Sequence, residues 1–392
     1  MVPNSREATL VVVSSPGEIR GEIGPVTVSM PWWQESGPVA DVLPGSLALR
    51  LLEADPERND EMGGEVTYLV QFDGPVPSPL VLRPNGHAEL LVDHPLRHPW
   101  ARVGGPTADL DWAKAQVRFD PAREPRQERT WNLSAIWSLP ILDEDGGPSI
   151  VWLKCVPPFF SHEAAVLNIM ADQSVPRIVA REQHRILMAD MPGHDGHTAT
   201  ADEEIAMVDS LMDIQVASAN RISDLLDAGV PDLRTPRLTD ELRELVDRVA
   251  PQDTLLGEFV ERLPERLQAV DAMGMPDVLV HGDPHGGNCR LGVSPPVWFD
   301  WGDSLIGNPL LDVAALHRMS APTVQHWLDR WGDEVPGSDP HRVWHLLKPV
   351  ALLRMAWVYQ RFCDNIEPAE HVYHTADVKR SLNDVCRTLE VY

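Results

Sequence analysis

Cysteine is scarce in this sequence of 392 residues. The four cysteines, at positions 155, 289, 363 and 386, lie far apart and form no C-x-x-C pair. This usage favours reduced thiols in a cytoplasm over a disulfide-built scaffold. Long apolar runs are missing too, because the longest, such as residues 10–13, have only the length of a strand, and the first residues show no export signal. We therefore expect a cytoplasmic protein that has no transmembrane segment.

Basic residues are also in short supply. Lys and Arg number 33 against 59 Asp and Glu, which gives a net charge of −26. Because phosphate recognition relies on clustered cations, this balance argues against nucleic acid or an anionic membrane as the partner. It is compatible with a cationic partner and equally with a generally solvated acidic surface. The length, with 43% hydrophobic and 23% charged residues, predicts two or three domains with sizeable cores.

The first 95 residues predict a small β-rich module. β-branched and apolar residues between Gly and Pro turns indicate four strands. These strands are expected at residues 9–13, 21–29, 47–52 and 65–72, with a helical stretch over 32–43. Residues 96–129 are predicted to be a linker with one short helix over 109–116, because Pro and Gly are frequent before it and 120–128 form a polar, Pro-marked connector. Neither part carries a motif that indicates chemistry.

From residue 130 the pattern predicts a second sheet and then helices. The strands are expected at residues 133–141, 150–156, 175–180 and 185–189, with a helix over 162–171. After residue 192 the chain is predicted to be helical over 202–228, 239–249, 252–272, 309–333 and 341–364. A short β interlude, at 277–281 and 297–300, interrupts these helices. We expect a sheet-rich segment over 130–192 and a helical one over 193–392.

The strongest local signal is the segment HGDPHGGN at residues 281–288. It is followed by DWGD at 300–303 and by GNPLLDVA at 307–314. An ATP γ-phosphate needs Mg²⁺ to neutralise its charge, and Mg²⁺ prefers oxygen ligands. Asn288 and Asp300 offer an amide oxygen and a carboxylate from two loops that a β-hairpin can bring together. Because Asp283 is placed to accept a hydrogen bond from an attacking hydroxyl, the pattern indicates phosphoryl transfer.

These three motifs, in this order and spacing, resemble the signature of the aminoglycoside phosphotransferase family, and every fixed position of that signature is matched. The resemblance covers roughly residue 131 to the C-terminus. It implies an α+β, protein-kinase-like bilobal fold, with a β-rich ATP lobe and hinge over 130–192 and a mainly helical lobe over 193–392. The small β-rich module over 1–95 and the linker over 96–129 precede it. The resemblance further implies ATP and Mg²⁺ as cofactors and a small-molecule hydroxyl acceptor.

Roles for individual residues follow from the same resemblance. Asp283 would be the catalytic aspartate, and Asn288 and Asp300 would be the magnesium ligands. The loops around them would be supported by His281, His285, Asp303 and Asp312.

A kinase-like nucleotide site also needs a strand lysine paired with a helix glutamate. Lys154 lies in a predicted strand and Glu163 begins the next helix, although only nine residues separate them. By the resemblance, adenine would bond to the backbone of Ala189 and Met191. Ser134 would lie in the turn that contacts the phosphates.

No motif identifies the acceptor, which could be an aminoglycoside, an amino sugar or an amino alcohol. Asp364 and Glu367 are candidates for holding its ammonium groups, with a solvated helix end as the alternative. Two other functions stay open: a non-catalytic nucleotide-binding member of the fold, and a metal-dependent hydrolase that uses His281, Asp283 and His285 as ligands. The hydrolase needs a further metal-ligating cluster, which the spacing of the remaining histidines does not indicate.

Overall fold

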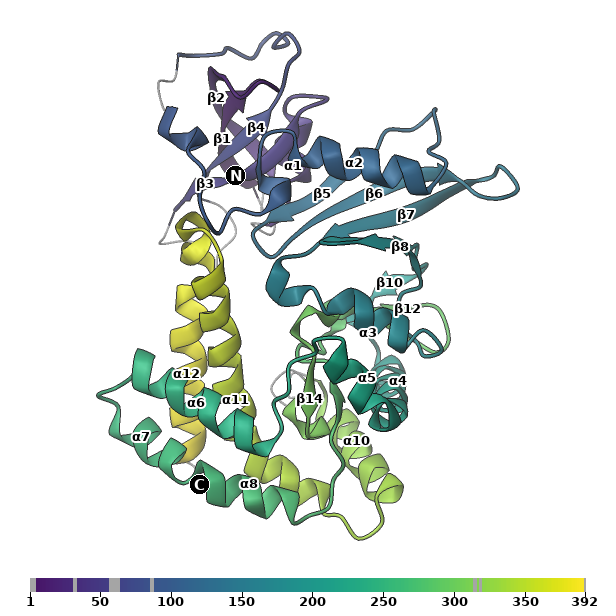
Figure 1. Ribbon diagram of the computed structural model, residues 1–392, viewed down its shortest axis with the longest axis vertical. Helices are drawn as coiled ribbons and strands as arrows, with labels where there is room; N and C mark the ends of the chain where they lie inside the picture. The colour runs from purple at the N-terminus through teal and green to yellow at the C-terminus, as the bar shows by residue number, and fades with distance from the viewer. Residues whose placement is uncertain are drawn as a thin grey trace. The chain divides into compact units, whose positions relative to one another are not determined.

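The computed structural model describes residues 5–30, 34–55, 64–84, 88–312, 316 and 319–390 (Figure 1). The chain forms two compact units. The first unit consists of Met1–Pro158, Val179–Asp190 and Arg361–Ala376. The second consists of Phe159–Ile178, Met191–Gln360 and Asp377–Tyr392. Among the helices in the described ranges, none is long and apolar enough to cross a membrane.

A four-stranded sheet at the N-terminus contains the four strands predicted for this region (Figure 1). They are β1 (Ser5–Val13), β2 (Ile19–Ser29), β3 (Leu47–Ala54) and β4 (Glu65–Gln71), in the order β2-β1-β4-β3. β1 runs antiparallel to β2 and parallel to β4. Both faces of β1 are covered, because Leu10 and Val12 belong to one apolar cluster and Val11 and Val13 to another. This double burial explains why β1 is a continuous apolar run.

The helix predicted over residues 32–43 is shorter than expected. Only α1 (Gly37–Asp41) is helical, and Trp32 and Trp33 lie outside the described residues. Pro38 at the start of α1 suits a first turn, where its missing N–H costs nothing.

The second sheet of the first unit has five strands in the order β5-β6-β7-β9-β8. They are β5 (Arg126–Trp131), β6 (Ser134–Leu142), β7 (Pro148–Cys155), β8 (Ile178–Glu182) and β9 (Arg185–Ala189). α2 (Gly105–Gln116) covers one face of this sheet, where Ala113 packs with Leu139 and Leu153 (Figure 1).

β5 corrects the sequence analysis, which placed its first residues in a polar connector. The buried positions of this strand are occupied by Gln127 and Thr130 rather than by apolar side chains. The Gln127 amide donates to Thr130 Oγ1 (2.8 Å) and exchanges hydrogen bonds with the Ala48 backbone (2.9 and 2.7 Å). Because these polar groups are satisfied by one another, the strand lacks the apolar alternation that predicts strands.

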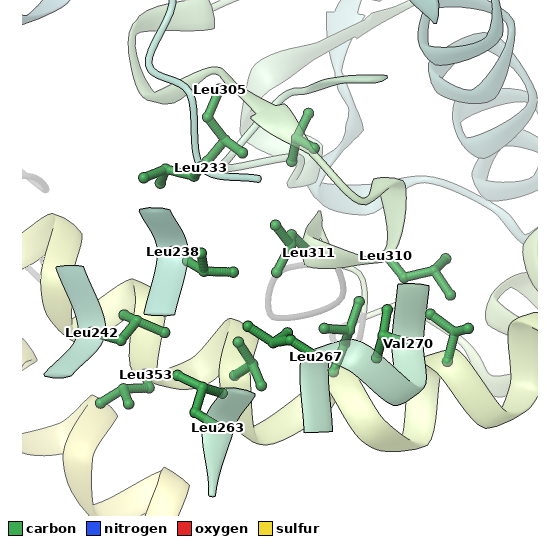
Figure 2. Close-up of a cluster of buried hydrophobic side chains, with 14 of the residues drawn as sticks. Leu233, Leu238, Leu242, Leu263, Leu267, Val270, Leu305, Leu310, Leu311 and Leu353 are labelled. Carbon is green, nitrogen blue, oxygen red and sulfur yellow. The ribbon is translucent and has the colours of Figure 1, made fainter. Parts of the chain in front are cut away.

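The second unit is mainly helical. Its helices are α3 (Glu163–Ile169), α4 (Ala201–Ser218), α5 (Ile222–Asp227), α6 (Thr235–Val249), α7 (Thr254–Glu261), α8 (Leu263–Asp271), α10 (Ala321–Glu334), most of α11 (Pro340–Asn365) and most of α12 (Thr375–Glu390). Figure 2 shows part of the core that joins them, a cluster of buried leucines in which Leu242 and Leu263 lie near Leu353.

The predicted long helices over 202–228 and 252–272 are interrupted, and the segment predicted as one helix over 309–333 contains separate elements. The one over 202–228 breaks at a 3₁₀ turn, Ala219–Arg221, and the one over 252–272 breaks at Arg262, just before Pro264. Within the described part of the helix predicted over 309–333, Pro309–Asp312 form a 3₁₀ turn and α10 starts at Ala321, where Ser320 caps it by accepting a hydrogen bond from the Thr323 N–H (3.4 Å). Pro and Ser thus set these boundaries by local capping.

Short strands inside the second unit hold the loops that carry the sequence motifs. β11 (Val278–Val280) pairs antiparallel with β14 (Leu305–Gly307). β12 (Cys289–Leu291) pairs antiparallel with β13 (Val297–Trp298) and with β10 (His194–Asp195). The β interlude predicted from the sequence is therefore present, divided between two small sheets.

Candidate active site

Two loops meet beside the β12–β13 hairpin. The first, residues 281–288, follows the buried strand β11 and leads through a 3₁₀ turn (Gly286–Asn288) into β12. The second begins directly after β13 and contains Asp300. The Phe299 N–H donates to the Asn288 carbonyl (3.0 Å), so the hairpin register continues into the loops. Asn288 and Asp300 are therefore brought together by backbone pairing.

His281 links these two loops through its ring. Its Nδ1 accepts a hydrogen bond from the Asp283 N–H (3.3 Å), and its Nε2 lies 3.0 Å from the Phe299 carbonyl oxygen. Because Nδ1 accepts, the neutral ring carries its proton on Nε2 and donates it to Phe299. The ring is fully buried, and this burial lowers its pKa to about 4. His281 is therefore a neutral cross-link that fixes the loops of Asp283 and Asp300.

The Asp283 carboxylate is oriented by His285. His285 Nδ1 accepts from the Gly287 N–H (3.0 Å), so its Nε2 carries the proton that faces Asp283 Oδ2 at 3.3 Å. Burial tends to raise the pKa of Asp283, but the hydrogen bond and charge of His285 outweigh burial and lower it. The Asp283 side chain is 33% exposed. It is thus an ionised carboxylate of fixed orientation that a ligand can reach.

Asn288 and Asp300 offer oxygen atoms beside this carboxylate. Asn288 Nδ2 donates to the Asp283 carbonyl (3.0 Å) and to Asp283 Oδ2 (3.4 Å), which leaves the amide oxygen Oδ1 as the atom available to a cation. Asp300 lies near enough to raise the pKa of Asp283 by charge repulsion. An amide oxygen and two carboxylates form a donor set of hard oxygens, which fits Mg²⁺.

Asp300 holds a strained backbone conformation. Its φ of 64° and ψ of 60° place it in the left-handed region, which only one other described non-glycine residue, Gln183, enters. Such a conformation costs about 1–3 kcal/mol and persists where the surroundings or the function impose it. Asp300 holds this conformation between the end of β13 at Trp298 and the 3₁₀ turn Trp301–Asp303.

Asp312 holds the first loop through hydrogen bonds to the backbone. Its carboxylate accepts hydrogen bonds from the N–H groups of His281 (3.2 Å) and Gly282 (2.8 Å) and from Gln215 Nε2 (2.9 Å). Burial raises the pKa of Asp312 to about 6 in spite of these bonds and of the Arg354 charge. Asp303 lies in the second loop, where its carbonyl packs on Gly282. The last motif positions, Val313 and Ala314, lie outside the described residues.

Arg354 is a residue of this site that the sequence analysis missed. It is 1% exposed, donates to the Gly282 carbonyl, and its charge is felt by Asp312, Asp303 and Asp283. A single arginine inside the apolar run over 350–358 of α11 is the signal that could have found it, because a buried cation needs anionic partners. Gln215, by contrast, gives no such signal in the sequence.

The nucleotide residues are divided between the two units. Lys154 lies on β7 opposite Ile136 and Ile186 and is 5% exposed. A lysine this buried is not a solvent-facing strand residue, since its charge requires partners. Glu163 begins α3 and is 1% exposed, and α3 contacts the 3₁₀ turn Trp301–Asp303. Lys154 belongs to the first unit and Glu163 to the second, so their ion pair stays a prediction.

The predicted hinge and phosphate-contacting residues occupy defined positions. Ala189 ends β9, and the Met191 carbonyl accepts a hydrogen bond from Arg290 Nε (3.2 Å). Ser134 begins β6 and is 5% exposed, and its hydroxyl accepts from Trp131 Nε1 (2.8 Å). The neighbouring Asn132 N–H is already bonded, so a phosphate contact from this turn would have to use Leu133 or Ser134.

The two candidate acceptor-binding acids differ in environment. Asp364 is exposed near the end of α11. Glu367 is 8% exposed and forms a two-pronged ion pair with Arg97, with distances of 3.1 Å to Nε and 2.9 Å to Nη2. The Glu367 carboxylate is therefore already paired with Arg97 in the interior, and the sequence does not indicate this partner.

A His/Cys/Asp group is present in the first unit, where ligand atoms of Asp109, Cys155 and His184 lie within 4.8 Å of one another. Asp109 Oδ1 accepts from Arg185 Nε (2.7 Å) and lies 3.1 Å from His184 Nε2, so its charge is already balanced. Burial raises the pKa of the Cys155 thiol well above its ordinary value. A protonated thiol and an ion-paired carboxylate are poor metal ligands, and the group instead fastens α2 to β7 and β9.

A hollow of about 250 Å³ opens beside His285. It is lined by Gly196, His197, Glu204, Met207, His285, Gly286 and Met319. Drug-sized ligands occupy pockets of about 300–1,000 Å³, so this hollow has room for a small polar molecule at most.

The five-stranded sheet with a buried lysine on its third strand, and the helical unit with paired loops, define a protein-kinase-like α+β fold. Residues 156–344, just under half of the chain, match the model of the phosphotransferase enzyme family. This match confirms the predicted family resemblance, and the solved structures described below share the predicted protein-kinase-like fold. The match leaves the N-terminal sheet outside it.

Solved structures with the same fold include an aminoglycoside 2'-phosphotransferase-IIIa in complex with GDP, which is 14% identical, with 73% of this chain and 97% of that chain covered and a TM-score of 0.51. A macrolide 2'-phosphotransferase of type I is 15% identical, with coverages of 71% and 96% and a TM-score of 0.52. The choline kinase LicA from Streptococcus pneumoniae is 11% identical, with coverages of 73% and 99% and a TM-score of 0.51. No curated protein sequence matches the chain.

Proposed function

We propose that the protein transfers the γ-phosphoryl group of ATP to a hydroxyl of a small polar acceptor in the presence of Mg²⁺. The acceptor class we favour is an aminoglycoside, an amino sugar or an amino alcohol, in keeping with the names of structures that share the fold. The observation that supports this most is the loop pair, in which Asp283, Asn288 and Asp300 are gathered by the β12–β13 hairpin and by His281.

In this proposal Asp283 accepts a hydrogen bond from the attacking hydroxyl and orients it toward the phosphorus. Its lowered pKa keeps it ionised at neutral pH, and His285 keeps its Oδ2 from rotating. A carboxylate with a low pKa is a weak base, so its main contribution is orientation rather than early proton removal.

Asn288 Oδ1 and the Asp300 carboxylate would hold the magnesium ion. When bound, Mg²⁺ supplies positive charge that neutralises the phosphate oxygens. Lys154 would contact the α- and β-phosphates, and Ala189 and Met191 would offer backbone groups to the adenine. Arg354 and Asp312 keep the loop that carries Asp283 in place, because Arg354 donates to the Gly282 carbonyl and Asp312 accepts from the Gly282 N–H.

The direct test is release of ADP with a panel of amino sugars, aminoglycosides and amino alcohols. Asp283→Asn is expected to lower kcat by about 10²–10⁴-fold, the usual contribution of a positioned acid–base group. Its KM for ATP should stay near that of the wild type, because Asp283 contacts the acceptor. Asp333→Asn, at an exposed position of the same unit, is the matched control and should leave both values unchanged.

Each alternative function has its own outcome in this experiment. Binding of ATP without turnover across the whole panel would identify a non-catalytic nucleotide-binding protein. Zinc or iron at one ion per chain in the purified protein, with no ADP release, would identify the hydrolase. Equal turnover by the wild type and Asp283→Asn would refute the assignment of Asp283.

A further inference from the structure

The turn between β5 and β6 (residues 131–134) is fixed by groups that come from outside its own sheet. Asn132 is 4% exposed, and its N–H donates to Glu370 Oε2 at 2.9 Å. Its side-chain oxygen accepts from the Glu367 N–H at 3.4 Å. Both partners belong to the C-terminal segment Arg361–Ala376, which is part of the same unit although it is more than 220 residues away in the sequence. A two-residue hairpin turn does not need such partners to form.

Glu370 is an unusual residue for such a contact. It is 1% exposed, and burial raises its pKa to about 7 in spite of the hydrogen bonds from Asn132. Placing a carboxyl group in the interior is costly unless its oxygens are hydrogen-bonded. The contact that compensates this cost is the one to the turn, so the position of Glu370 and the position of the turn depend on each other.

Residues before β5 hold the same turn from a second direction. Trp100 Nε1 donates to the Trp131 carbonyl at 2.9 Å. Arg97 forms its two-pronged ion pair with Glu367, and each side chain is only 10% exposed. A desolvated, two-pronged pair is far more specific than a surface ion pair. The linker, the turn and the C-terminal segment are thus joined in one chain of contacts.

The C-terminal segment is itself anchored in the N-terminal sheet. Tyr373 is 4% exposed and packs in the apolar cluster of β1, β2 and β4, with Leu10 and Tyr68 among its members. The His374 ring stacks on Trp131 at 5.8 Å between centroids. Figure 1 shows the connection between α11 and α12 beside β3 of this sheet. The N-terminal module therefore supports the segment that supports the turn.

We propose that Arg361–Ala376 is a positioning element for the β5–β6 turn, and that Glu370 is its positioning residue. The inference rests on the proposed function in one respect, because that turn is the one expected to contact the nucleotide phosphates. The proposal also gives the N-terminal module a role. The module and the linker hold the segment that contains Glu367 and Glu370, and these two residues keep the turn in one conformation. A turn that is held before the nucleotide binds need not be ordered by it, which favours binding.

The test compares two variants of Glu370 by amide hydrogen exchange and by steady-state kinetics. E370L removes the acceptor, whereas E370Q keeps an acceptor oxygen of the same length without the charge. With E370L, the peptide that contains the turn should exchange faster while peptides from β9 stay unchanged. The KM for ATP should rise about tenfold with kcat nearly unaffected, which corresponds to about 1.4 kcal/mol. E370Q should resemble the wild type in both measurements.

Unchanged exchange of the turn in a folded E370L protein would overturn the inference, as would an unchanged KM when the wild type turns ATP over. If E370L does not fold, R97Q is measured in its place. This variant removes the ion pair between Arg97 and Glu367 and leaves the buried Glu370 side chain unchanged. R97Q must then show the same local increase in exchange, and its absence would also overturn the inference. A wild type that releases no ADP refutes the proposed function alone, since the exchange measurement still decides whether Glu370 holds the turn.

Discussion

Gly282 lets us predict how tightly the two active-site loops are packed. It has a φ of +92°, and a Cβ atom added there would lie 2.1 Å from the Asp303 carbonyl oxygen and 2.7 Å from its carbon. Both of these atoms are backbone and cannot rotate away. Gly282→Ala must therefore displace one loop from the other, in addition to forcing an alanine into the left-handed region.

The loss of unfolding free energy in Gly282→Ala has two parts, the cost of the left-handed backbone and the cost of displacing the loop. The left-handed backbone alone costs an alanine about 1–2 kcal/mol. Gly229 has a φ of +91°, and a Cβ atom added there would meet nothing within 4 Å, so Gly229→Ala in the same unit incurs only the backbone cost. Forcing extra volume into a packed site adds about 1–3 kcal/mol. The unfolding free energy of Gly282→Ala should therefore lie about 2 kcal/mol below that of Gly229→Ala.

Urea denaturation followed by tryptophan fluorescence measures both variants, and Trp301 lies in the loop that Gly282 contacts. Displacing Asp303 also moves Asp300, so the activity of Gly282→Ala should fall while that of Gly229→Ala stays near the wild-type value. If the two variants lose the same stability, or if Gly282→Ala keeps full activity, the loops are not packed as closely as the distances state. In that case the packing of the two loops would not be what holds Asp283 and Asp300 near each other.

Three further predictions concern buried charge and backbone strain. Arg354→Met should lower the unfolding free energy by about 3 kcal/mol, because it leaves buried carboxylates unpaired, and Arg354→Lys should cost less in the same urea titration. Asp300→Ala should cost about 1 kcal/mol more than Asp300→Asn by urea denaturation, since asparagine tolerates the left-handed backbone, while both should lose ADP release. Because the pKa of Glu370 is raised to about 7 in the folded state, the folded protein binds a proton that the unfolded chain releases between about pH 4.5 and 7. As the pH rises through that range, the unfolding free energy of the wild type should fall by about 3 kcal/mol relative to that of Glu370→Gln. If urea titrations show the same difference in unfolding free energy at every pH, the prediction is wrong.

The meeting of the two candidate active-site loops could be predicted from the sequence because the residues that bring them together are close in the chain. Asp283 and Asn288 are five residues apart, and the β-hairpin that brings Asp300 to them is encoded by the short apolar strands around it. The burial of Lys154 also follows its apolar neighbours in β7. In each case the residues that determine the geometry lie within about twenty positions of one another.

The contacts that hold these loops could not be predicted in the same way, because they are distant in the sequence. Arg354 reaches Gly282 from a helix 72 positions later, and Glu370 reaches Asn132 across 238 positions. Arg354 interrupts an apolar run, but that run does not indicate which group Arg354 contacts, and Glu370 gives no signal of either kind. The strand β5 was missed for a related reason, since Gln127 satisfies its buried amide with Ala48 in another sheet. Long-range polar contacts of this kind become visible only in the folded chain.

Tyr373 has a consequence for how the protein is made. The aromatic ring of Tyr373 packs in the core of the first sheet, although Gln71, the last residue of β4, lies about 300 positions earlier in the sequence. The ribosome therefore synthesises these strands long before Tyr373, and part of the apolar interior of the sheet stays uncovered until Tyr373 has emerged. A chain cut before Tyr373 should therefore expose apolar side chains of β1, β2 and β4 and depend on chaperones to stay in solution.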